Sequence, residues 1–101
     1  MNLRLSPAAT GALLMLSLAA QAQAANGKAI FDDNCADCHA GGGAPQIGDN
    51  DAWQSRIDKG VDTLYANAIN GVGNMPARGG NDDLSDSEVK AAVDHIVDES
   101  Q

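Results

Sequence analysis

The most regular pattern of apolar and polar positions lies near the C-terminus of the chain. Five apolar residues there recur at spacings of three and four, as on one face of a helix: Val89, Ala92, Val93, Ile96 and Val97. Ser85 and Glu88 precede them with the Ser-x-x-Glu spacing, in which the N-cap and the third helical residue exchange backbone hydrogen bonds. The pattern predicts an amphipathic helix that starts after Ser85 and buries its apolar face.

Three shorter helical patterns precede this one. We expect the first over residues 26–34 with Asn26 as N-cap, the second from a cap at Asn50 to just before Gly60, and the third over 62–70. Gly71 should stop the third helix. Their expected apolar residues are Ile30, Phe31, Trp53, Ile57, Leu64, Tyr65, Ala68 and Ile69. No stretch alternates as a strand would, so the predicted fold is all-α, with about four short helices.

Two Gly-rich segments, residues 40–48 and 71–80, separate these helices, and each contains one proline, Pro45 or Pro76. Long irregular segments in a compact domain are usually either disordered or wrapped around something. The loops therefore suggest a bound group that the helices enclose.

The N-terminal segment has the order of features typical of a secretory signal peptide. Arg4 is followed by a short apolar run over residues 11–20 and by the small residues of Ala22-Gln23-Ala24. The run is too short to span a bilayer as a helix. We predict cleavage after Ala24, which makes residues 1–24 the signal peptide and residues 25–101 a soluble domain exported to the periplasm.

Size and charge restrict what this domain does. Cleavage after residue 24 leaves 77 residues with five basic and 14 acidic side chains, a formal net charge of -9. Nucleic-acid binding is disfavoured, because phosphate contacts need clustered Lys and Arg. Chains below about 70 to 80 residues rarely fold on apolar burial alone. A disulfide, metal or cofactor held by the two cysteines should therefore complete the core.

The segment Cys35-Ala36-Asp37-Cys38-His39 has the Cys-x-x-Cys-His spacing at which c-type haem is attached. Two thiols three positions apart near a helix end can each reach one vinyl group, and His39 then lies below the iron as its proximal ligand. A thioredoxin-like redox pair would need a βαβ context. A zinc site would need a fourth ligand, and His95 is 56 positions beyond His39. An accidental match of the motif and a plain disulfide are the remaining alternatives.

The second axial position of such a haem iron is filled by Met, His or solvent, and each implies a different function. Met75 is the only methionine after residue 24, and it lies in the second Gly-rich loop, 36 residues after His39. We therefore predict Met75 as the distal iron ligand. The rival is His95, which borders the apolar face of the last helix and is expected to be a packing residue.

Residues 27–97 together resemble a class I c-type cytochrome, and specifically the bacterial cytochrome c-five group. The matching features are Gly27 and Phe31 four apart, the Cys35–His39 motif, residues 44–48, Trp53 followed by Arg56, and residues 63–71 leading to Met75-Pro76. One departure is that residues 81–84 lack the second cysteine pair that often follows the Met loop in that group. The loop should therefore lack that additional staple.

The resemblance implies roles for individual residues. Cys35 and Cys38 would form the thioether attachments, and His39 and Met75 would be the axial ligands, with the Pro45 carbonyl accepting the other ring N–H of His39. Trp53 and Arg56 would lie near the haem propionates. The resemblance also implies a helix contact: Gly27 and Phe31 would meet Ala92 and His95 where the first and last helices cross.

The predicted function is that of a one-electron carrier, not an enzyme, with redox proteins as donor and acceptor, including a membrane-bound oxidase or reductase. Two other interpretations stay open at this stage: a haem peroxidase or gas sensor, and a fixed subunit of a larger redox complex. Residues 40–48 and 66–77 carry no charged side chain. We therefore expect an uncharged docking rim around the exposed haem edge, with Arg78 beside it.

Overall fold

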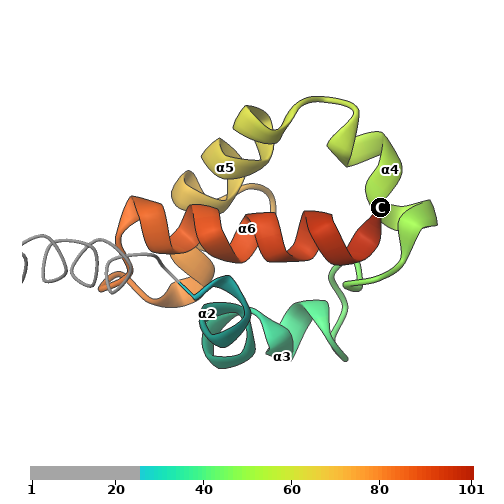
Figure 1. The fold of residues 1–101 in the computed structure, drawn as a ribbon. Helices are drawn as coiled ribbons and strands as arrows, with labels where there is room; N and C mark the ends of the chain where they lie inside the picture. Colours follow the sequence, from blue (N-terminus) through green and yellow to red (C-terminus); the bar gives the residue numbers. More distant parts are fainter. Residues whose placement is uncertain (1–25) are drawn as a thin grey trace, which may run out of the picture.

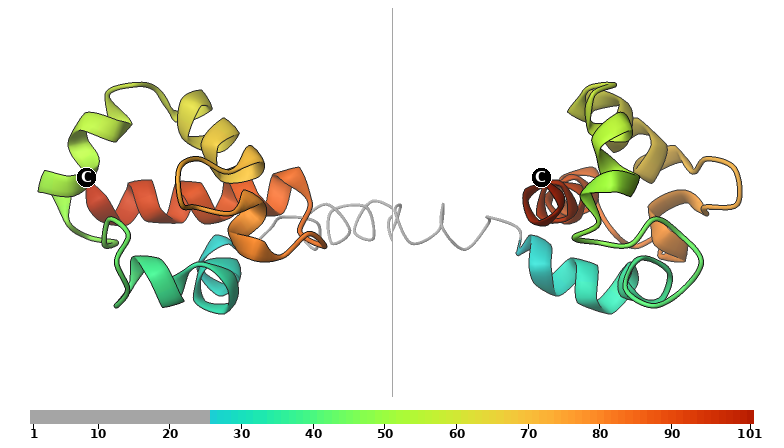
Figure 2. Two further views of the ribbon diagram at one scale, coloured as in Figure 1. Left: turned by 180° about the vertical axis from the view of Figure 1, so that it is seen from behind. Right: turned by 90° about the vertical axis from the view of Figure 1, so that its right-hand side faces the viewer.

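The computed structural model describes residues 26–101, and all of the regular elements in that range are helical. They are α2 (Gly27–Asn34), α3 (Ala36–His39), α4 (Asn50–Ile57), α5 (Val61–Asn70), the 3-10 helix η2 (Ala77–Gly80) and α6 (Asp86–Ser100). The helix α6 crosses the middle of the molecule, with α2 and α3 on one side and α4 and α5 on the other (Figures 1 and 2). The all-α prediction is confirmed. The predicted signal peptide lies outside the described residues.

The starts of the helices follow from short polar side chains at their N-caps. Asn26 accepts a hydrogen bond from the Ala29 amide, and Ser85 and Glu88 form the reciprocal capping box expected from their spacing. The expected cap of the second helix was one residue off. Asp49 accepts from the Ala52 amide, whereas the side chain of Asn50 donates to the Ser100 carbonyl at 3.0 Å.

The helices α5 and α3 also differ from the sequence-based expectation. The helix α5 begins at Val61, one residue early, because Gly60 turns the chain with a φ of 101°. The helix α3 was not predicted. The amide of Cys35 still donates to the Phe31 carbonyl at 2.8 Å, and the chain then starts a new turn at Ala36. Cys35 thus lies between two helices, at the end of α2.

The five residues of the predicted apolar face of α6 are all buried, but they divide between two clusters. Val89, Val93 and Val97 pack with Leu64 and Ala68 of α5. The second cluster is formed by residues of α2, α4 and α6: Phe31, Trp53, Ala92 and Ile96. A single helix therefore links the half of the molecule that carries the cysteines to the half that leads to Met75.

The crossing of α2 and α6 is close because Gly27 has no side chain. A Cβ atom at this position would lie 2.2 Å from the carbonyl oxygen of Ala91. The implied contact thus involves the Ala91 backbone, one residue before the expected Ala92. Phe31 does pack in one cluster with Ala92, and its ring lies 5.5 Å from that of His95. Within residues 26–101 no helix is long and apolar enough to span a membrane.

Candidate functional site

The two cysteines lie at the junction of α2 and α3 as free thiols, Cys35 half-buried and Cys38 exposed. Burial raises the pKa of the Cys35 thiol, and the neighbouring Cys38 adds to the effect. Neither sulfur atom is in a disulfide, so both are available for covalent attachment. Among the residues that the structure describes, no three His, Cys, Asp or Glu side chains are grouped so as to hold a metal ion.

His39 is buried and held from two sides by the first Gly-rich loop. Its Nδ1 atom lies 2.8 Å from the carbonyl oxygen of Pro45, and its own carbonyl accepts from the Ile47 amide at 2.7 Å. A carbonyl oxygen only accepts hydrogen bonds, so Nδ1 carries the ring proton and Nε2 keeps its lone pair. The ring is therefore oriented with one nitrogen available to a metal.

The side chain of Gln46 holds this loop in shape. Its Oε1 accepts from the Gly41 amide at 2.6 Å, and its Nε2 lies within 3.0 Å of the carbonyl oxygens of Cys38, Gly42 and Ala44. Gln46 was not singled out as a site residue. The available signal was that it is the only polar side chain within residues 40–48.

Trp53 joins α4 to the same loop. Its indole N–H donates to the Gln46 carbonyl at 2.8 Å, and its ring centroid lies 5.8 Å from that of His39. The guanidinium of Arg56 lies over the Trp53 ring at 5.9 Å and also donates to the Ala52 carbonyl. The structure therefore places the buried Trp53 beside His39, with the exposed Arg56 over the Trp53 ring.

Met75 lies half-buried in the loop that follows α5. Its amide donates to the Val72 carbonyl at 2.8 Å, and the Val72 amide donates back to the Met75 carbonyl at 3.1 Å. Its side chain packs against the cluster formed by α5 and α6. Gly71 opens this turn with a φ of 86°, and a Cβ there would lie 3.0 Å from the Met75 carbonyl oxygen. The turn therefore requires glycine at that position.

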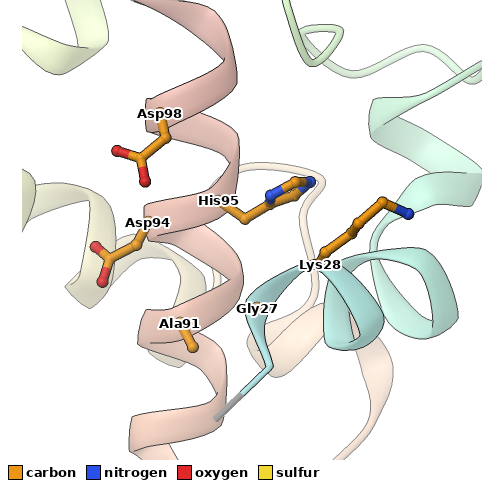
Figure 3. A pocket seen from close by; sticks show the side chains of 6 residues that line it. All are labelled: Gly27, Lys28, Ala91, Asp94, His95 and Asp98. Carbon is orange, nitrogen blue, oxygen red and sulfur yellow. The ribbon is translucent and has the colours of Figure 1, made fainter. Parts of the chain in front are cut away.

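Two other residues singled out in the sequence, His95 and Arg78, contact neighbouring helices. His95 packs against Phe31 with the two ring planes inclined at 59°, and it borders a shallow surface pocket between α2 and α6 (Figure 3). Arg78 was expected beside the docking rim, and the structure shows which groups its side chain binds. Its guanidinium pairs with Asp86 at 2.7 Å and donates to the Leu84 carbonyl at 2.9 Å, because the backbone turns it towards the start of α6.

The chemistry of these residues fits a c-type haem. Two free thiols flank one helical turn, an imidazole with a free Nε2 follows them, and a thioether lies in the opposite Gly-rich loop. Gly41 and Gly43, in the loop beside the imidazole, are exposed, and a Cβ at either would meet no atom within 4 Å.

Comparisons with known proteins agree with this chemistry. The family model described as cytochrome C oxidase, cbb3-type, subunit III matches residues 22–96. Cytochrome c-555 of Chlorobaculum tepidum is 46% identical and covers 95% of each chain. Cytochrome c5 of Ectopseudomonas mendocina is 43% identical over 63% of this chain and 78% of its own.

The fold gives the same result. A chain from the crystal structure of an electron transfer complex of nitrite reductase with cytochrome c has a TM-score of 0.71 to this chain and 35% sequence identity. That match covers 75% of this chain and 95% of the other. The sequence-based resemblance is therefore confirmed: the chain belongs to the class I monohaem cytochromes c, small electron carriers that hold a covalently bound haem c.

Proposed function

We propose that this chain is a one-electron carrier in which Cys35 and Cys38 form the thioether bonds to the haem, and His39 and Met75 are the axial ligands. The observation that carries this assignment is the hydrogen bond from His39 Nδ1 to the Pro45 carbonyl, which leaves the lone pair of Nε2 free to bind the iron. Met75 is the only thioether in residues 25–101. The imidazole of His39 and the thioether of Met75 are both neutral ligands, so they add no charge to the iron.

The bound haem supplies an iron that cycles between the ferrous and ferric states, and a His/Met ligand pair raises its potential relative to two histidines. The protein's part is to hold both ligands in place in each state. Pro45 and Trp53 fix the imidazole, and the Val72–Met75 bridge fixes the main chain beside the thioether. Rigid ligands keep the structural change between the two states small.

Trp53 and Arg56 have a proposed role near the haem propionates. The support is their position: Trp53 is buried beside His39, and the exposed Arg56 places its guanidinium over the Trp53 ring. An exposed guanidinium on this side is suited to pair with a carboxylate. Trp53 would contribute packing, and Arg56 the charge.

The proposed partners are redox proteins, including a membrane-bound oxidase or reductase, and the proposed compartment is the periplasm, reached through a signal peptide over residues 1–24. The cytochrome c in the complex with nitrite reductase supports a redox enzyme as partner. We propose the uncharged loops 40–48 and 66–77 as the docking rim. Because these loops are neutral and charges beyond the rim are screened over about 8 Å, added salt should slow electron exchange with a partner only modestly. The chain would have no substrate site of its own.

One spectroscopic experiment tests this assignment. The ferric holoprotein should show the charge-transfer band of a Met thioether on iron, and the ferrous holoprotein should fail to bind carbon monoxide at neutral pH. If the band is absent and carbon monoxide binds readily, the carrier assignment is overturned in favour of the peroxidase or gas-sensor interpretation.

A further inference from the structure

The segment that follows Met75 combines one apolar anchor with several polar contacts. No residue from Ala77 to Leu84 is buried, and within this segment Leu84 packs, partly buried, against the cluster of α5 and α6. Residues 81–84 also lack the cysteine pair that would staple this segment covalently. Its polar contacts therefore decide how firmly the loop is closed.

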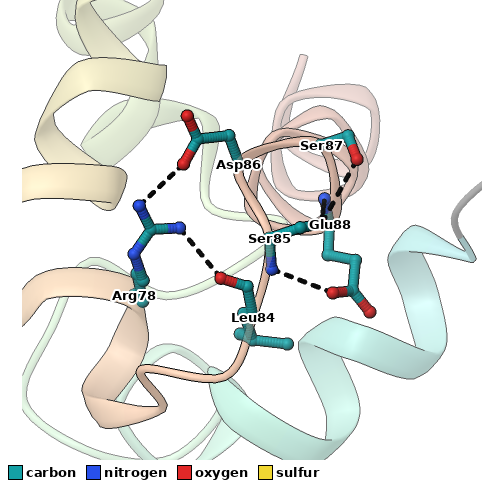
Figure 4. Close-up of polar contacts among 6 residues, drawn as sticks. All are labelled: Arg78, Leu84, Ser85, Asp86, Ser87 and Glu88. Carbon is teal, nitrogen blue, oxygen red and sulfur yellow. Dashed lines mark hydrogen bonds and ion pairs between the residues drawn. The ribbon is translucent and has the colours of Figure 1, made fainter.

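Arg78 makes the first of these contacts. It is the only residue other than glycine within residues 26–101 with a positive φ, 57°. This left-handed conformation is unfavourable for a bulky side chain, so the surrounding contacts must maintain it. The guanidinium donates to the Leu84 carbonyl and to the Asp86 carboxylate at the start of α6 (Figure 4). We name these three residues the Arg78 clasp.

A second contact connects the same loop to the haem-attachment side of the molecule. Asn81 Nδ2 donates to Asn34 Oδ1 at 2.9 Å, and Asn34 Nδ2 in turn donates to the Ile30 carbonyl at 3.0 Å. The backbone also approaches closely here, since a Cβ at Gly79 would lie 2.9 Å from the Asn34 carbonyl oxygen. Asn34 immediately precedes Cys35, so the Asn34–Asn81 link joins the end of α2 to the Met75 loop.

We propose that Arg78 and Asn81 are positioning residues that keep the Met75 loop closed and thereby slow the departure of Met75 from the iron. The Arg78 clasp joins the loop to the start of α6, and the Asn34–Asn81 link joins it to the end of α2. Together they do noncovalently what a second cysteine pair would do. This inference rests on the proposed function, in which Met75 is the distal ligand.

The test measures the rate at which imidazole displaces Met75 from the ferric holoprotein, followed through the loss of the thioether band. Arg78→Gly is the informative variant, because glycine adopts a positive φ readily and only the guanidinium contacts are lost. We expect imidazole to bind roughly three- to tenfold faster, the net effect of losing about one ordinary hydrogen bond, because the Arg78 side chain is partly exposed and water replaces some of its contacts. Asn81→Ala should act in the same direction.

A readout that does not depend on the iron accompanies the kinetics. The Gly79 amide donates to the Pro76 carbonyl at 3.3 Å and the Asn81 amide to the Arg78 carbonyl at 3.1 Å. Amide hydrogen exchange at both positions should accelerate in Arg78→Gly, while exchange in the middle of α6 stays as in the parent.

Two controls separate positioning from charge and from general stability. Asp82→Asn removes an acid from the same loop that forms no ion pair with any residue of 26–101. Asp49→Ala removes an acid that caps α4, away from the loop. Both should bind imidazole at the parent rate.

The outcomes are distinct. A parent rate in Arg78→Gly, or equal acceleration in Asp49→Ala, overturns the clasp while leaving Met75 as ligand. Absence of the thioether band in the unmutated protein overturns the proposed function instead.

Discussion

The Nδ1 atom of His39 lies 2.8 Å from the carbonyl oxygen of Pro45, six residues further along the chain. This contact joins the haem-attachment motif to the first Gly-rich loop. The shape of that loop therefore determines the orientation of the imidazole, and a ligand's second hydrogen bond also tunes its basicity. Gln46 becomes important for this reason, since its side chain holds the loop together.

Replacing Gln46 with alanine should destabilise the holoprotein. The change leaves the Gly41 amide and three carbonyl oxygens without their shared partner. Because these groups are partly exposed, water replaces some of the lost contacts, and the free energy of unfolding should fall by about 1–3 kcal/mol. Denaturant unfolding of the ferric protein measures it. Gln54→Ala, on the exposed surface of α4, is the matched control and should unfold like the parent; equal loss in both variants would contradict the role of Gln46.

Replacing Met75 with alanine should convert the carrier into a ligand-binding haem protein. The tether through Cys35 and Cys38 remains, while one axial position opens. We expect a reduction potential lower than that of the parent. The variant should also bind carbon monoxide and show some peroxidase activity, which the parent should lack. Met75→His should also lower the potential but keep six ligands, because a second histidine replaces the thioether. Redox titration together with carbon monoxide difference spectra checks both variants, and an unchanged potential in Met75→Ala would exclude Met75 as ligand.

The fold should depend on the haem. Within residues 26–101 the nine buried apolar residues divide between two small clusters, and the two Gly-rich loops contribute none of them. A domain of this size has little apolar surface to bury without a cofactor. We expect the double variant Cys35→Ala with Cys38→Ala, expressed without attached haem, to be largely unfolded. Helical circular dichroism with a cooperative thermal transition in that variant would contradict this.

Gly27 should be intolerant of even a methyl group. A Cβ there meets the Ala91 carbonyl oxygen at 2.2 Å, so α2 and α6 would have to move apart. Gly27→Ala should lower the free energy of unfolding by about 1–3 kcal/mol, as expected for overpacking. Gly43→Ala is the control, because a Cβ at Gly43 meets no atom within 4 Å. Thermal unfolding of the two holoproteins gives the comparison, and a neutral Gly27→Ala would show that the crossing tolerates a larger separation.

Tyr65 should titrate at unusually high pH. Its hydroxyl donates to the Asp94 carboxylate, and this hydrogen bond is the main cause that raises the pKa of Tyr65 to about 12. A raised pKa means that the contact stabilises the fold below pH 10, the ordinary value, and that its contribution is lost as pH rises towards 12. Asp94→Asn should return the pKa towards 10. The chain has one tyrosine, so tyrosinate absorbance reports this residue alone; identical titrations in both proteins would exclude the Asp94 contact.

Local patterns in the sequence determine a large part of this protein. The Ser85–Glu88 spacing and the apolar face of α6 depend on neighbouring residues only, and both are confirmed. The Cys-x-x-Cys-His motif is equally local, because attachment chemistry requires its spacing, and the cytochrome c family and its haem follow from it. The choice of Met75 needed only the composition of residues 25–101, and its role as ligand stays a prediction.

Only the tertiary structure decided which polar groups meet across the chain. Asp49 caps α4 because Asn50 contacts Ser100, 50 residues away in sequence. The sequence places Arg78 next to an uncharged loop and names no partner for it, whereas a left-handed backbone turns its guanidinium onto Leu84 and Asp86. Gln46 and the Asn34–Asn81 link likewise depend on how the loops fold back. Helical periodicity is encoded over a few neighbouring positions, whereas the partner of a polar side chain in an irregular loop depends on distant segments that only folding brings together.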